Sequence, residues 1–159
     1  MIKKIIVVTF CLIVVISGVI TPASAFTPTT FDVDAEGALL INIDTEDVIF
    51  SKNINTKLYP ASLTKLLTAL ILYENTNNLD TEIITVSENA IKLLQGTDSS
   101  VGGLKPGEQL TVRQMLYVLL LSSANDGANA IAEHVAGDID SFIVMMNEKA
   151  ASLNMTGSH

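Results

Sequence analysis

Residues 59–75, YPASLTKLLTALILYEN, place a serine and a lysine three positions apart where an apolar helical pattern begins. Leucine and isoleucine side chains recur at helical intervals through this stretch, which predicts an amphipathic to buried helix. Pro60 lies just ahead of the pattern, where proline is tolerated near a helix start. Residues three apart lie on one helix face, so we expect the Ser62 hydroxyl and the Lys65 amine to meet.

This pair allows two interpretations. Ser62 can simply cap the helix, with Lys65 as a solvated lysine of the first turn, since serine is common at helix starts. A cation in the first turn opposes the helix dipole, however, because carboxylates are preferred there. A function for Lys65 would explain that cost.

A second polar motif, Ser123-Ala124-Asn125, lies between two helical patterns in the sequence LLLSSANDGANAIAEHVAG. By itself it can be a helix-breaking turn in which Ser123 or Asn125 caps the following helix. An S-x-x-K motif followed by an S-x-N motif is far more specific than either alone, because serine hydrolases and acyltransferases of one type use the two together.

The N-terminus has the order of a secretory signal peptide. Lys3 and Lys4 precede an uncharged apolar run, and Ala23-Ser24-Ala25 supplies small residues for cleavage. We therefore predict a signal peptide at residues 1–25 and a short tether at 26–35. The one cysteine, Cys11, falls inside the signal, so the exported chain would have no disulfide.

The exported chain is strongly acidic. Removing Lys3 and Lys4 leaves seven basic residues against 17 acidic ones, a net charge of about −10. Such a charge argues against nucleic acid or an anionic membrane as partner. The sequence contains only two histidines, His134 and His159, so we do not expect a zinc site.

The rest of the chain combines a few short strands with several helices. Two apolar segments around a polar turn predict a hairpin of residues 38–43 and 48–50, and the first is apolar enough to be covered on both faces. A short strand is expected just before Ser87. Capping and turn residues predict helices at 87–96, 112–121, 126–135 and about 140–153. The fold class is therefore α+β, with too few strands to form a good sheet alone.

Three segments carry a family resemblance: YPASLTKLLTALI, LKPGEQLTVRQMLYVLLLSSANDGANAIAEHVAG and FIVMMNEKAASLNMTGSH. Together they resemble the serine D-alanyl-D-alanine carboxypeptidases, the low-molecular-weight penicillin-binding proteins. The resemblance extends over residues 36–159, which we interpret as part of a catalytic domain. It implies a β-lactamase/transpeptidase-like fold.

The resemblance also implies roles for the polar residues of the two motifs. Ser62 would be the acylated nucleophile and Lys65 its general base, while Ser123 would relay a proton to the leaving D-alanine. Asn125 would position Lys65 and the substrate amide. The implied substrate is a peptidoglycan stem peptide ending in D-Ala-D-Ala, outside the cytoplasmic membrane, and β-lactam antibiotics would acylate the same serine. No metal or organic cofactor is implied.

One part of the family pattern is missing from the sequence. The third motif, Lys-Thr/Ser-Gly, does not occur, because no lysine is followed by Thr-Gly or Ser-Gly. We therefore expect the chain to be an N-terminal fragment that is truncated before the remaining sheet strands, and unstable or inactive alone. We expect the complete protein to contact a membrane only through a C-terminal anchor.

Three alternatives remain. A class A β-lactamase shares the first two motifs, but usually has aspartate where Ala124 stands and needs a deacylating glutamate further along. A non-catalytic wall-binding pseudoenzyme would keep the motifs without the activity. An exported helical interaction domain would carry the motifs by accident.

Overall fold

The structure, a computed structural model, describes residues 32–159. The predicted signal peptide and most of the predicted tether therefore lie outside the described residues. The chain divides after Leu58 into two compact units, each described here by itself. In residues 32–159, no helix has both the length and the apolar character that crossing a membrane requires.

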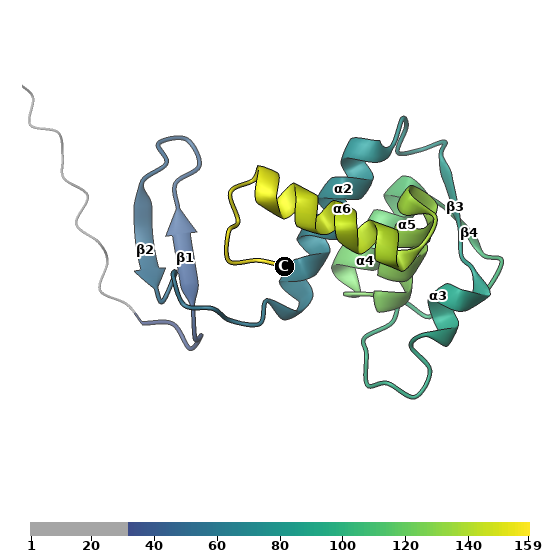
Figure 1. Cartoon of the computed structure of the whole chain (residues 1–159), viewed down its shortest axis with the longest axis horizontal. Coiled ribbons are helices and arrows are strands. Elements are labelled where there is room, and N and C mark those ends of the chain that lie inside the picture. The colour runs from purple at the N-terminus through teal and green to yellow at the C-terminus, as the bar shows by residue number, and fades with distance from the viewer. Residues whose placement is uncertain (1–31) are drawn as a thin grey trace, which may run out of the picture. The chain divides into compact units, whose positions relative to one another are not determined.

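The first unit contains the predicted hairpin (Figure 1). Strands β1 (Ala38–Ile41) and β2 (Val48–Lys52) pair antiparallel, with Leu39 opposite Ser51 and a register shift after Leu40. The turn is closed by Asn42, whose main-chain N–H donates to the Asp47 carbonyl at 2.9 Å. The hairpin prediction is confirmed.

The expectation that the first strand is covered on both faces is wrong for this unit. Leu39 is 56% exposed, and Leu40 and Ile41 are also exposed. A two-stranded sheet leaves both faces open unless another element packs on it. No other helix or strand occurs in the described part of this unit, so the apolar side chains stay accessible.

The second unit is mainly helical and also contains a two-stranded antiparallel sheet, in which Ile84 pairs with Leu110. In chain order its elements are the 3-10 turn η1 (Ala61–Leu63), α2 (Thr64–Asn75), β3 (Ile83–Thr85), α3 (Glu88–Lys92), β4 (Gln109–Thr111), α4 (Val112–Leu121), α5 (Asn125–Ala136) and α6 (Ile139–Ser152). Strand β4 was not predicted from the sequence.

Several helix ends follow from the local sequence. The Ser87 hydroxyl accepts from the Ala90 N–H at 2.9 Å, and Thr111 and Gln114 form a reciprocal capping box at the start of α4. Gly137 ends α5 in the left-handed conformation, with φ 86°. Helix α3 ends at Lys92, earlier than predicted, and a turn continues to Gly96.

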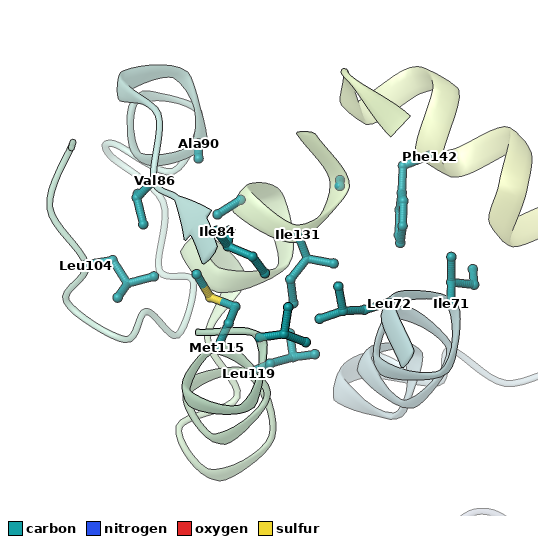
Figure 2. Packing of buried hydrophobic residues seen from close by; sticks show 13 residues of the cluster. Ile71, Leu72, Ile84, Val86, Ala90, Leu104, Met115, Leu119, Ile131 and Phe142 are labelled. Atoms are coloured by element: carbon teal, nitrogen blue, oxygen red, sulfur yellow. The ribbon is translucent and has the colours of Figure 1, made fainter. Parts of the chain in front are cut away.

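The core of this unit lies between the helices and the face of β3 (Figure 2). Helix α2 packs against α4, α5 and α6. The side chains with no exposed surface include Leu72 from α2, Met115 and Leu119 from α4, and Ile131 from α5. Burying each such side chain stabilises the fold by roughly 1.5–3 kcal/mol. This packing fixes the start of α2 and the turn between α4 and α5.

Candidate active site

Ser62 lies in the 3-10 turn that leads into α2. The residue that caps α2 is Leu63, and it makes no side-chain capping bond, so Ser62 is not the N-cap. Ala61, just before it, has φ 47°, which is uncommon for a residue other than glycine. Such a conformation costs roughly 1–3 kcal/mol and persists only where the surroundings hold it.

Lys65 is buried, with only 9% of its surface exposed. The first turn of α2 contains no acidic residue, and no ion pair within residues 32–159 involves Lys65. The interpretation of a solvated first-turn lysine is therefore wrong. Burying a lysine at the positive end of a helix without a carboxylate partner lowers the stability of the fold. A catalytic role for Lys65 would explain why this cost is retained.

Ser123 reaches Ser62 across 61 positions of sequence. It lies in the turn between α4 and α5 with φ 51°, and its Oγ donates a hydrogen bond to Ser62 Oγ at 2.7 Å. The cap of α5 is Ala124, again without a side-chain capping bond, so neither Ser123 nor Asn125 caps this helix. The simple capping interpretation of the second motif is thus also wrong.

Two adjoining cavities bring the four predicted residues together. One, of about 470 Å³, is lined by Ser62, Lys65 and Asn125. The other, of about 440 Å³, is lined by Ser62, Lys65 and Ser123. Ser62 and Lys65 therefore border both cavities, with Asn125 on one side and Ser123 on the other.

The arrangement suits nucleophilic catalysis. The Ser62 and Ser123 hydroxyls share a hydrogen bond at 2.7 Å, and Ser62 can accept this bond while its own proton goes to a base, because a hydroxyl has one proton to donate and two lone pairs that accept. A serine becomes a good nucleophile only when an adjacent base takes that proton, and the lysine of the same cavities can fill this role. These groups can support acyl transfer through a covalent intermediate.

Three further polar residues line the larger cavity and were not predicted as site residues: Thr64, Thr68 and Asn129. Thr68 follows Lys65 by three positions on α2, and Asn129 follows Asn125 by four positions on α5. Helical spacing places Thr68 on the same face of α2 as Lys65, and Asn129 on the same face of α5 as Asn125. The sequence therefore contained the spacing that could have identified Thr68 and Asn129.

His134 lies away from these cavities, and its Nε2–H donates a hydrogen bond to the Glu82 carboxylate at 2.8 Å. Glu82 also accepts bonds from the Thr76 hydroxyl and the Asn77 main-chain N–H. The hydrogen bonds from His134, Asn77 and Thr76 lower the pKa of Glu82 to about 2. In residues 32–159, no three His, Cys, Asp or Glu side chains form a group that could hold a metal ion.

Solved structures share this fold. The Streptomyces K15 DD-transpeptidase is 30% identical, with a TM-score of 0.74 over 82% of this chain and 52% of that one. Penicillin binding protein 6B from Escherichia coli is 29% identical, with a TM-score of 0.73 over 85% of this chain and 44% of that one. The predicted transpeptidase-like α+β fold is confirmed.

Curated relatives agree. D-alanyl-D-alanine carboxypeptidase DacF of Bacillus subtilis (strain 168) is 37% identical over 77% of this chain and 31% of its own length. D-alanyl-D-alanine carboxypeptidase DacC of Escherichia coli (strain K12) is 34% identical over 84% of this chain and 37% of its own length. The chain thus spans about a third of these two relatives. Residues 23–159 match the family described as D-alanyl-D-alanine carboxypeptidase, Peptidase_S11, and the chain belongs to this family.

Proposed function

We propose that this chain carries the nucleophile-bearing part of a serine-type D-Ala-D-Ala carboxypeptidase. The observation that carries the proposal is the 2.7 Å hydrogen bond between Ser62 and Ser123, beside the buried Lys65. Family membership supports the reaction class, because the relatives DacF and DacC are named D-alanyl-D-alanine carboxypeptidases. The activity is proposed for the whole protein, since the chain covers only part of each relative's length.

In the proposed reaction Lys65 takes the proton from Ser62 Oγ as this oxygen attacks the carbonyl carbon of the penultimate D-alanine. The peptide bond to the terminal D-alanine then breaks. Ser123 passes its hydroxyl proton to the leaving amine and takes up the proton that Lys65 had accepted, so that Lys65 is neutral again. The remaining peptide is now an ester of Ser62. Water attacks this ester, which releases the shortened stem peptide and restores the serine hydroxyl.

Two neighbouring groups would stabilise the acylation step. The Ser62 main-chain N–H lies in the turn that opens α2, where helix geometry favours developing negative charge on the attacked carbonyl oxygen. Asn125 lines the larger cavity and would hold Lys65 and the substrate amide by hydrogen bonds. Ser62, Lys65 and Ser123 are therefore the proposed catalytic residues, with Asn125 as a substrate-binding residue.

The same serine would open the strained amide ring of a β-lactam and form a long-lived ester. Peptidoglycan lies outside the cytoplasmic membrane, and the signal peptide predicted at residues 1–25 would direct the protein there. No nucleic acid is proposed as partner, because the chain is acidic.

The test is intact-mass measurement of the full gene product after incubation with benzylpenicillin. We expect one penicillin to be added to Ser62, none in Ser62→Ala, and an unchanged adduct in the control Ser51→Ala, at an exposed position of strand β2. Release of D-alanine from a D-Ala-D-Ala peptide should follow the same pattern.

Other outcomes would overturn the proposal in recognisable ways. Rapid penicillin hydrolysis without D-alanine release would indicate a β-lactamase. Peptide binding without an adduct would indicate a wall-binding pseudoenzyme. An adduct on a serine other than Ser62 would contradict the assigned nucleophile.

A further inference from the structure

Asp126 is a buried carboxylate that neither motif includes. It lies in the first turn of α5, only 2% exposed, and forms no ion pair within residues 32–159. Three main-chain N–H groups donate to its carboxylate: Gly127 at 2.9 Å, Gly102 at 2.8 Å and Leu104 at 3.1 Å. A buried carboxylate needs such donors, because leaving its charge uncompensated is costly.

Two of these donors belong to the loop between α3 and β4, far away in sequence. The same loop makes two more bonds to the turn that carries Ser123. The Ser100 carbonyl accepts from the Asn125 N–H at 2.9 Å, and the Ser100 hydroxyl donates to the Ser122 carbonyl at 2.9 Å. Residues before and after Ser123, namely Ser122 and Asn125, are therefore both hydrogen-bonded to this loop.

Gly102 allows the loop to approach this closely. A Cβ atom built there would lie 2.5 Å from Val118 Cγ1 on α4 and 3.2 Å from Ala124 Cβ. Contacts below 3.0 Å essentially never occur for real Cβ atoms. The loop thus packs directly on the end of α4 and on the residue after Ser123, with Asp126 bonding its main chain.

Ser123 needs this support because of its backbone. At φ 51° it has a conformation that costs roughly 1–3 kcal/mol for a residue other than glycine, so its surroundings must hold it. In this conformation its hydroxyl reaches Ser62. Asp126 lines neither cavity of the site, so it acts on the site through the loop and the turn.

We propose that Asp126 is a positioning residue: its carboxylate fastens the loop at Gly102 and Leu104 to the α4–α5 turn and so keeps Ser123 within hydrogen-bond reach of Ser62. This proposal rests on the function proposed above. The contacts that hold Ser123 in place therefore come from the loop at Gly102 and Leu104 and not from the S-x-N motif itself. Loosening the loop leaves every catalytic group present but lets Ser123 leave the orientation that protonates the leaving group.

The test variant is Asp126→Asn in the full gene product, which keeps the side chain's size but turns one acceptor into an N–H donor. We expect acylation of Ser62 by benzylpenicillin to slow about 10- to 100-fold, the effect of a small misplacement of a catalytic group. Amide hydrogen exchange at Gly102 and Leu104 should accelerate. The matched control is Asp138→Asn, because the Asp138 carboxylate bonds only to Ser141 and the Asp140 main chain, in the first turn of α6.

A double-mutant cycle distinguishes positioning from a general loss of structure. If Asp126 acts through Ser123, Asp126→Asn should cause no further slowing in a Ser123→Ala background. Equal slowing in both backgrounds would overturn the positioning role. If Asp126→Asn does not fold, Ser100→Ala replaces it, because Ser100 is exposed and its hydroxyl makes another of the bonds that join this loop to the α4–α5 turn. We expect that variant to slow acylation about 2- to 10-fold, again only when Ser123 is present.

The outcomes separate the two proposals. A wild-type protein that benzylpenicillin does not acylate would overturn the proposed function, and the positioning role with it. A wild-type protein that is acylated, with Asp126→Asn reacting equally fast, would overturn the positioning role alone.

Discussion

The hairpin and the helical unit differ in what holds their backbones. Within residues 32–159 every buried side chain belongs to the helical unit, and the hairpin contributes none. The hairpin is held by main-chain pairing and turn contacts such as those of Asn42. The helical unit has in addition a core in which α2, α4 and α5 pack together.

The difference explains where strained backbone can carry function. Both units contain residues other than glycine with positive φ, such as Asn53 in the hairpin unit and Ser123 in the helical unit. Asparagine tolerates this conformation in an exposed turn, whereas Ser123 is held in it by bonded and packed neighbours. Only the unit with a core can hold two serine side chains in a fixed relation, which a catalytic site requires.

The largest contrast should come from two lysines, one buried in the helical unit and one partly exposed in the hairpin. Lys65→Met removes the proposed base, and we expect acylation by benzylpenicillin to fall about 10²- to 10⁴-fold. Lys52→Met in β2 removes a surface pair with Asp32 at 2.9 Å and should leave that rate unchanged. Stopped-flow or quenched mass measurements give both rates. If Lys65→Met kept a tenth or more of the wild-type acylation rate, Lys65 would not be the general base.

Core truncation should give the next largest contrast, now in stability. Leu72→Ala empties a site with no exposed surface, and we expect the free energy of unfolding to fall by about 2–5 kcal/mol. Leu40→Ala in the hairpin removes a side chain that is 47% exposed, and its cost should stay below about 1 kcal/mol. Urea denaturation of the full gene product measures both. Equal losses would show that the hairpin is as well packed as the helical unit.

The features predicted from sequence were those with a local cause. Helix α4 has the predicted bounds, because its capping box lies within four consecutive residues. Strand β4 was missed, because it has only three residues and exists through pairing with Ile83–Thr85. Local pattern cannot show such a partner.

The same distinction applies to the site. The S-x-x-K and S-x-N motifs were visible in the sequence, but their meeting was implied only by the family resemblance, since Ser62 and Ser123 are 61 positions apart. Asp126 was not predicted to matter, because its donors Gly102 and Leu104 lie 24 and 22 positions away. Only the folded loop shows why this aspartate is buried.

Helix capping offers a smaller contrast. Thr111→Ala breaks the capping box of α4, and we expect a loss of about 1 kcal/mol, within a usual range of 0.5–2. Thr45→Ala in the hairpin turn removes a bond to Asp47 between exposed side chains, and its effect should lie within about 0.5 kcal/mol. Thermal and urea unfolding compare the two. A larger loss for Thr45→Ala would mean that the turn, more than the cap, sets the stability of the chain.

The smallest contrast concerns acid stability. Hydrogen bonds from His134, Asn77 and Thr76 lower the pKa of Glu82 to about 2 from its usual 4.5. The folded chain therefore binds this proton more weakly than the unfolded chain does. The stabilisation is complete above about pH 4.5 and is lost as the pH falls toward 2.

Glu82→Gln should flatten the fall of the unfolding free energy between pH 4.5 and 2, the window set by the pKa of Glu82. Glu36→Gln in the hairpin unit is the matched change, because the Glu36 carboxylate is exposed and makes no hydrogen bond to residues 32–159. It should leave the slope as in the wild type. Urea midpoints measured at half-unit pH steps give both slopes. If Glu36→Gln flattened the curve as much as Glu82→Gln, the acid sensitivity would not come from the bonds that join His134 on α5 to Glu82, just before β3.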